Sequence, residues 1–145
     1  VREKATAALL RKNNNAKLKK QKKIEWCGDG EQTRSFLYID DCIEATMSVF
    51  DSNFTDAFNL GSEEQVSINQ MIDIISKIAD YKINKNYLLD KPKGVRGRSS
   101  DNTKIFNDLR WKPEIKLIDG LTKTYEWIYN EIKNNSNNFK YTRAY

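Results

Sequence analysis

The chain has 145 residues, 39% of them hydrophobic and 31% charged, a size and balance that predict one compact domain with a polar surface. It contains no histidine and two cysteines, Cys27 and Cys42, which excludes zinc chemistry, histidine acid/base catalysis and a disulfide framework within the chain. No apolar run approaches the roughly 20 residues that a membrane span needs. The N-terminus has no apolar stretch of signal-peptide type, so we expect a cytoplasmic location and no membrane partner.

The net charge of +5 comes entirely from the front of the chain. Residues 1–23 hold nine lysines or arginines and one acid, which gives +8, so the remaining residues sum to −3. The densest part, residues 17–23, is either an arm that binds nucleic acid or a membrane surface, or a solvated surface loop. It has no aromatic residue for base stacking and no apolar face for a membrane. The solvated loop is therefore favoured, and no specific nucleic-acid partner is expected.

The first forty residues predict a helix followed by two strands. The helix covers residues 2–12, which are rich in alanine and leucine, and is expected to end at the three asparagines 13–15. The strands are expected over residues 24–27 and 34–39, and a turn around Gly28-Asp29-Gly30 follows the first of them. This order places three polar side chains at the rim of a sheet, where a phosphate or a sugar can reach them: Gln32, Thr33 and Arg34.

A second helix is expected to begin at Asp40 or Asp41, because a carboxylate can cap the first backbone amides of a helix. Ile43, Met47 and Phe50 follow with helical spacing, which predicts that they share one apolar face of this helix.

The rest of the chain continues the alternation of short strands and helices. Ser67 and Gln70 form a capping box that starts the clearest helix of the sequence. The other expected elements are a buried strand at 57–60, a strand at 85–89, a basic loop at 90–100, a short helix capped by Asp101 and a last helix after Gly120. The pattern predicts an α/β domain over residues 1–133 with a polar, frayed tail at 134–145. The glycine-rich phosphate loop of nucleotide-binding folds is missing.

Four sequence pieces occur in an order that is typical of one enzyme family. They are Arg2-Glu3-Lys4-Ala5 with Arg11-Lys12; Gly28-Asp29-Gly30 with Gln32-Thr33-Arg34-Ser35-Phe36; Asn59-Leu60-Gly61-Ser62 with Val66-Ser67; and Gly94-Val95-Arg96-Gly97-Arg98 with Ser100-Asp101-Asn102. With them, residues 1–132 resemble the C-terminal, substrate-binding portion of GDP-mannose 3,5-epimerases, which are extended short-chain dehydrogenases/reductases. The resemblance implies that the N-terminal Rossmann core is mostly absent from this chain.

The resemblance implies an NAD-dependent conversion of GDP-mannose to GDP-L-galactose or to the C5 epimer. In that family, transient oxidation at C4 acidifies the protons on C3 and C5, and a cysteine and a lysine remove and return them. Lys4 matches the lysine of this pair. The cysteine and NAD are expected to belong to an N-terminal half that is absent here, so the chain alone is expected to be inactive.

The resemblance also implies a set of substrate contacts. The implied contacts are Glu3, Lys4 and Ala5 with the sugar, Lys12 and Arg98 with phosphate, and Gln32, Thr33 and Arg34 with the nucleotide end. Taken singly, each of these residues is more often an ordinary surface or turn residue, and only their order as a set favours a site. No cofactor-binding or metal-binding residue is expected within the chain. Full-length family members are expected to be homodimers, whereas this chain alone can be a monomer.

Two other patterns are interpreted as structural. Tyr87 and Lys91 match the Tyr-x-x-x-Lys pattern of dehydrogenases, but that pair needs a helix and the match begins on a predicted strand. Cys27 and Cys42 are expected to be packing residues. Two alternatives for function stay open: another nucleotide-sugar epimerase, dehydratase or decarboxylase, and a small basic module that binds nucleic acid through residues 11–23.

Overall fold

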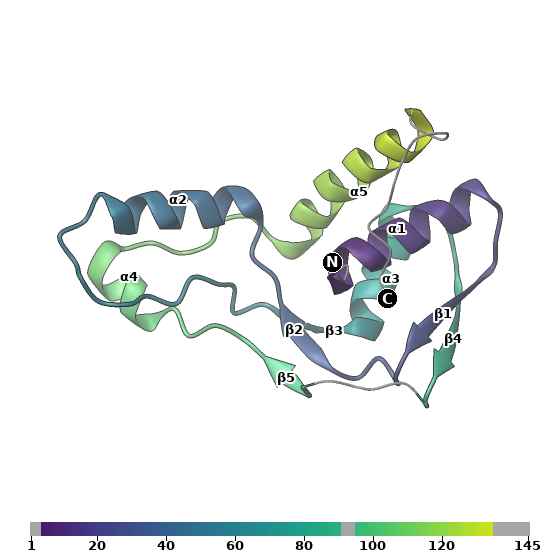
Figure 1. Ribbon diagram of the computed structural model, residues 1–145, viewed down its shortest axis with the longest axis horizontal. Helices are drawn as coiled ribbons and strands as arrows, with labels where there is room; N and C mark the ends of the chain where they lie inside the picture. Colours follow the sequence, from purple (N-terminus) through teal and green to yellow (C-terminus); the bar gives the residue numbers. More distant parts are fainter. Residues whose placement is uncertain (1–3, 91–94, 135–145) are drawn as a thin grey trace.

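The computed structural model describes residues 4–90 and 95–134, which form five helices and five short strands (Figure 1). The helices are α1 (Ala5–Leu18), α2 (Ile39–Phe50), α3 (Ile68–Ile78), α4 (Thr103–Leu109) and α5 (Leu117–Asn134). The strands are β1 (Lys23–Cys27), β2 (Thr33–Ser35), β3 (Gln65–Ser67), β4 (Asn84–Leu88) and β5 (Gly97–Arg98). The predicted α/β class is confirmed.

The strands form two small sheets. In the first, β1 and β4 pair in parallel over five residues. In the second, β2 lies in the middle, with β3 antiparallel on one side and β5 parallel on the other. The register of this sheet sets Arg34 directly beside Arg98. Two residues that are far apart in sequence are thereby brought to one point.

The main core lies where α1, α3 and α5 meet the pair of strands β1 and β4. Leu10, Met71, Ile72 and Ile75 are almost fully buried there. A smaller core joins α2 to α4 at the other end of the molecule, around Ala45, Ile105 and Trp111 (Figure 1). The polar pocket described below borders the smaller core, because Leu37, Phe58 and Leu60 line the pocket and also pack against that core. No helix within residues 4–90 and 95–134 is long and apolar enough to cross a membrane.

The first helix does not end at the asparagines. α1 continues through them to Leu18, and Asn13 and Asn14 are buried. Asn14 donates from Nδ2 to the backbone oxygen of Tyr125 on α5 at 3.4 Å. The expectation from helix propensity is wrong because packing against α5 outweighs the weak preference of asparagine for helix ends. The lysine-rich segment is also more ordered than expected, since Lys17 donates to the backbone oxygen of Ala79 at 2.6 Å.

The predicted helix starts have mixed outcomes. The capping box of α3 is confirmed: Gln70 donates its backbone N–H to Ser67 Oγ at 3.1 Å, and Ser67 N donates to Gln70 Oε1 at 2.8 Å. The predicted cap of α2 is wrong, because α2 begins at Ile39 and has no side-chain cap. Asp41 is instead buried and accepts a hydrogen bond from the backbone N–H of Ile115 at 3.0 Å. That carboxylate holds the segment before α5 rather than its own helix.

Two predicted strands differ from those observed. The strand expected at residues 34–39 covers only Thr33–Ser35, and Ile39 already belongs to α2. Residues 57–60 are not a strand, although Phe58 packs against the smaller core as a buried strand residue would. Apolar residues in such a segment indicate burial, but the segment forms a strand only if another strand lies beside it and pairs with its backbone.

The buried hydroxyl of Tyr125 on α5 should make the stability of the main core depend on pH. Its hydroxyl has no hydrogen-bond partner among the described residues, and burial raises its pKa to about 12, with Tyr129 adding to the shift. Between pH 10 and 12 the folded state therefore keeps a proton that the unfolded state loses, so the free energy of unfolding should fall as pH rises. Urea denaturation across this window should show a shallower fall for Tyr125→Phe than for the unsubstituted chain. Equal slopes would contradict this role of the buried hydroxyl.

Candidate functional site

A polar pocket of about 570 Å³ opens beside the paired strands β2 and β5. Three segments line it: residues 34, 35 and 37, residues 58–62, and residues 98–100. None of the lining residues is an acid, and two of them are arginines. The pocket is therefore suited to an anion.

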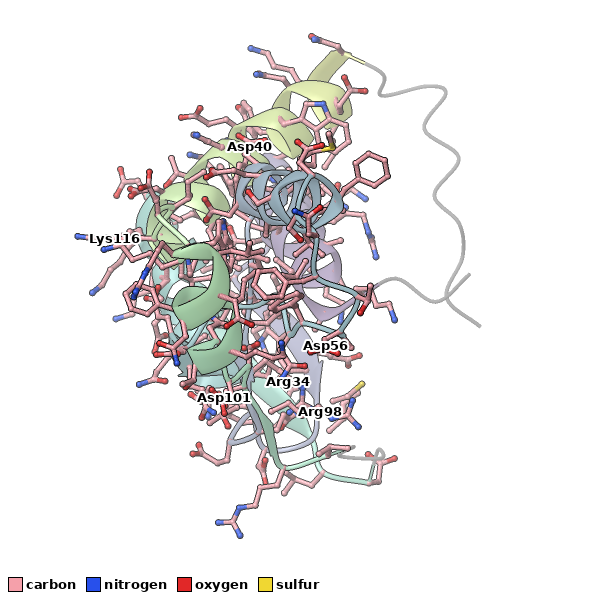
Figure 2. The ribbon with its side chains drawn as sticks, turned by 90° about the vertical axis from the view of Figure 1, so that its left-hand side faces the viewer. Arg34, Asp40, Asp56, Arg98, Asp101 and Lys116 are labelled. Atoms are coloured by element: carbon pink, nitrogen blue, oxygen red, sulfur yellow. The ribbon has the colours of Figure 1, made fainter. Side chains whose placement is uncertain are left out.

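Arg34 and Arg98 supply the positive charge from adjacent strands (Figure 2). The guanidinium of Arg34 donates to the backbone oxygens of Thr33 at 2.6 Å and Val95 at 2.7 Å. These bonds fix the direction of the side chain and leave other N–H groups of the guanidinium for a ligand. Arg98 is exposed, so the pair combines one held cation with one accessible cation.

A buried asparagine holds the other two walls of the pocket together. Asn102 donates from Nδ2 to the backbone oxygen of Gly61 at 2.7 Å and accepts a hydrogen bond from Ser100 Oγ at 2.8 Å. Gly61 has no room for a side chain, because a Cβ there would overlap the side chain of Ser100. Asn102 lies within one of the sequence motifs, but no role was predicted for it. Its signal was the polar pair Ser100 and Asn102 directly after the predicted phosphate arginine.

Gln32 and Thr33 lie next to the pocket but do not line it. Thr33 donates its backbone N–H to the oxygen of Arg96 at 2.9 Å, which joins β2 to the segment that enters β5. Its hydroxyl would meet any Cβ at Gly97. Gln32 accepts a backbone hydrogen bond from Ile68 at 3.2 Å, and its side-chain Oε1 is buried without a partner among the described residues.

The glycine turn before β2 is fixed by Asn69 in the first turn of α3. Gly30 has a φ of 76°, in the left-handed region that favours glycine, and its oxygen accepts from the backbone N–H of Asn69 at 3.0 Å. The side-chain amide of Asn69 donates to the oxygen of Asp29 and to the carboxylate of Glu31. Tyr87 on β4 donates its hydroxyl to Asn69 Oδ1 at 2.7 Å. One side chain thereby ties the turn to α3 and to the other sheet.

The predicted residues of the front helix do not line the pocket of the arginine pair. Lys4 is the exposed N-cap residue of α1, and Ala5 is the first residue of that helix. Lys12 donates to the backbone oxygen of Glu25 at 2.9 Å and lies 5.2 Å from the ring centroid of Trp26. It is not among the residues that line the pocket. The predicted contact Glu3 lies outside the described residues.

The two patterns interpreted as structural have different outcomes. Tyr87 lies on β4, with its hydroxyl bound to Asn69, so it has a structural contact; Lys91 lies outside the described residues. The expectation that Cys27 is a packing residue is wrong, because Cys27 is exposed on β1. The burial pattern of β1 explains this, since alternate residues such as Trp26 face the core.

The described residues do not form a binding site for NAD. A dinucleotide site needs a strand, a glycine-rich loop and a helix N-terminus in succession. β2 leads into α2 and β3 leads into α3, and β5 leads into α4, yet none of these connections contains a glycine. Residues 4–90 and 95–134 therefore offer a place for an anion and no cradle for a dinucleotide.

Comparisons with known proteins find relatives that match most of the chain. GDP-mannose 3,5-epimerase 1 from Oryza sativa subsp. indica is 44% identical over 132 residues, which cover 91% of this chain and 34% of that protein. GDP-mannose 3,5-epimerase from Arabidopsis thaliana is 40% identical over the same shares of both chains. The crystal structure of UDP-glucuronic acid 4-epimerase from Bacillus cereus, in complex with UDP-glucuronic acid and NAD, matches with a TM-score of 0.75 at 30% identity. The match covers 88% of this chain and 40% of that one.

These matches confirm the predicted resemblance and show that it extends over only part of each relative. The chain spans about a third of the length of the curated relatives it matches. A family model described as GDP-mannose 4,6 dehydratase matches residues 2–124, which is most of the sequence. The chain therefore belongs to the GDP-mannose 4,6-dehydratase family of extended short-chain dehydrogenases/reductases.

Proposed function

We propose that this chain is the C-terminal, substrate-binding half of an NAD-dependent GDP-mannose 3,5-epimerase. Residues 1–133 are the sugar-nucleotide-binding domain, and residues 134–145 are a polar tail. The observation that carries the proposal is the pairing of Arg34 with Arg98 in a pocket without acids. Relatives that are 40–44% identical over 91% of this chain are named GDP-mannose 3,5-epimerases, which favours GDP-mannose as the substrate.

The charges of the pocket suit a nucleotide diphosphate. A diphosphate carries two negative charges, and each charge-assisted hydrogen bond from a guanidinium contributes about 1.5–3 kcal/mol. Arg34 is already held by backbone oxygens, so less side-chain freedom is lost when it binds a ligand. The hydroxyls of Ser62, Ser99 and Ser100 add donors for the remaining oxygens.

In this proposal, different residues of the chain have different roles. Arg34, Arg98, Gln32 and Thr33 hold the nucleotide and its phosphates. Lys4, at the exposed start of α1, exchanges protons with the sugar, and NAD is held by residues outside those described here. NAD supplies hydride chemistry at the sugar when it is bound. The chain alone therefore binds substrate and does not turn it over, and the complete enzyme acts in the cytoplasm.

Isothermal titration of the 145-residue chain with GDP-mannose tests the proposal. Arg98→Ala should weaken binding by roughly tenfold to a hundredfold, because one charge-assisted contact is lost. Lys77→Ala is the matched control, since Lys77 is an exposed cation on α3 outside the pocket and its loss should leave the affinity unchanged. Equal weakening by both substitutions would show a general charge effect and would contradict a site at the arginine pair.

A second candidate function is a 4-epimerase of uridine-linked sugars. It is favoured by the match to UDP-glucuronic acid 4-epimerase from Bacillus cereus at 30% identity. Titration with UDP-glucuronic acid under the same conditions separates the two candidates. Tighter binding of the guanosine-linked sugar supports the 3,5-epimerase, and tighter binding of the uridine-linked sugar supports the 4-epimerase.

A further inference from the structure

The serines that line the polar pocket differ in how free their hydroxyls are. The hydroxyl of Ser100 donates a hydrogen bond and that of Ser62 accepts one, whereas Ser35 is half-buried on the central strand β2. Ser99 also lines the pocket and is exposed, and its hydroxyl makes no hydrogen bond within residues 4–90 and 95–134. Ser99 is therefore the serine of the pocket wall that is most open to a modifying enzyme.

The segment that leads to Ser99 is basic and accessible. Arg96 precedes Ser99 by three residues and Arg98 by one, and residues 95–99 are all exposed. A protein kinase with acidic subsites binds such a segment, because its carboxylates pair with the guanidinium groups of the substrate. β5 has only two residues, so little strand pairing has to open when this segment enters a kinase.

We propose that Ser99 is a phosphorylation site for an arginine-directed protein kinase and that its phosphate closes the pocket to substrate. The inference rests on the proposed function, in which the same pocket holds the diphosphate of a nucleotide sugar. In the transfer, Ser99 Oγ forms a bond to the γ-phosphorus of a nucleoside triphosphate. The bond from that phosphorus to the β–γ bridging oxygen breaks, the nucleoside diphosphate leaves, and the hydroxyl proton passes to a base of the kinase.

A phosphate on Ser99 would meet two cations that the fold already brings together. Arg34 is held by the backbone oxygens of Thr33 and Val95, and the pairing of β2 with β5 sets Arg98 beside it (Figure 2). Phosphoserine carries about −1.5 to −2 charges near neutral pH and three acceptor oxygens, which form charge-assisted hydrogen bonds with guanidinium groups. The pocket has no acid among its described lining residues, so no carboxylate there repels the phosphate.

The tether gives this phosphate an advantage over a free ligand. A group joined to its site by a short flexible linker has an effective concentration on the order of millimolar. A nucleotide sugar would have to displace it, because two phosphate groups beside the same pair of arginines repel each other. Modification of Ser99 should therefore weaken the binding of nucleotide sugars without unfolding the chain.

Phosphorus NMR of the 145-residue chain, with phosphoserine incorporated at position 99, tests whether the phosphate contacts the arginines. The second ionisation of free phosphoserine has a pKa of about 6. Contact with Arg34 and Arg98 should lower that pKa by about one unit, because nearby cations favour the dianion. Arg98→Ala should raise it again. Arg96→Ala is the matched control, since Arg96 lies in the same exposed segment but does not line the pocket. An ordinary pKa in the otherwise unsubstituted chain would overturn the proposal.

Isothermal titration with GDP-mannose tests the effect on binding. Phosphoserine at position 99 should weaken binding by roughly tenfold or more, the loss expected when a charge-assisted contact is blocked. The control carries phosphoserine in place of Thr46, an exposed residue of α2 outside the pocket, and should keep the affinity of the unmodified chain. Equal weakening at both positions would overturn the proposal. If the unmodified chain did not bind GDP-mannose, the proposed function would fail, while the phosphorus pKa would still report whether Ser99 phosphate contacts the arginines.

The catalytic subunit of cyclic-AMP-dependent protein kinase, which selects serines that follow arginine, is the probe for recognition of the segment. With ATP it should phosphorylate the chain at Ser99, as located by mass spectrometry, and Ser99→Ala should remove that product. Arg96→Ala should slow the reaction by roughly tenfold, because one guanidinium contact with the kinase is lost. Phosphate found only at other residues would overturn Ser99 as the site.

Discussion

Lys4→Met is expected to lower epimerisation by roughly a hundredfold to ten-thousandfold, the usual contribution of a general acid or base. The test uses a chimera in which this chain replaces the matching 132-residue segment of GDP-mannose 3,5-epimerase 1 from rice. Methionine keeps the length of the side chain and removes the amine that would exchange protons with the sugar. Lys4 lies at the exposed start of α1, where its side chain makes no capping hydrogen bond. The measurement is the incorporation of solvent deuterium at C3 and C5 of GDP-mannose.

The control for Lys4 is Lys19→Met at the other end of the same helix. Lys19 is the C-terminal cap residue of α1 and is exposed, so its loss removes the same charge far from the proposed chemistry. It should leave deuterium incorporation unchanged. If Lys4→Met reduced only the affinity for GDP-mannose and not the exchange at saturating substrate, Lys4 would be a binding residue and the proposed acid/base role would be wrong.

Gly30→Ala is expected to destabilise the chain by about 3 kcal/mol, combining left-handed backbone strain with lost hydrogen bonds. Gly30 has a φ of 76°, and a Cβ there would overlap the side-chain amide of Asn69. Asn69 would have to leave its contacts with Asp29, Glu31 and Tyr87. Urea denaturation measures the loss.

A double-mutant cycle separates the two parts of this cost. In an Asn69→Ala background the overlap is gone, so adding Gly30→Ala should cost only the backbone part, about 1–2 kcal/mol. Gly28, with a φ of 78°, has the same backbone requirement, and Gly28→Ala gives an independent value for that part. Additive effects of Gly30→Ala and Asn69→Ala would mean that the asparagine does not hold the turn.

Local signals in the sequence predicted local structure well. The capping box of Ser67 and Gln70 and the turn at Gly30 were found because hydrogen bonding and backbone preference act over a few residues. The predicted arginines Arg34 and Arg98 do share one pocket. Their adjacency, however, depends on the pairing of β2 with β5, which no local pattern reveals.

The errors arose where distant packing decides the outcome. Asn13 and Asn14 stay helical because α5 covers them, and Asp41 binds the segment before α5 rather than capping its own helix. The spacing of Ile43, Met47 and Phe50 correctly predicted one apolar face of α2. Periodicity alone does not tell whether such a face packs against the core or is exposed, and here it is exposed. Asn102 was missed because its buried contacts come from segments that are remote in sequence.

The pairing of β2 with β5 also has a consequence for the order of folding. β5 has only two residues, and it pairs with β2, which lies much earlier in the chain. Bringing the two strands together closes a long loop, and the few hydrogen bonds of so short a pairing offset little of that entropy cost. The main core joins α1 to α5 across an even longer stretch of chain, but it buries far more apolar surface, which offsets that entropy cost. We therefore expect the pairing of β2 with β5, and with it the anion pocket, to open before the main core. A nucleotide that contacts both Arg34 and Arg98, as proposed, should therefore stabilise this pairing of strands.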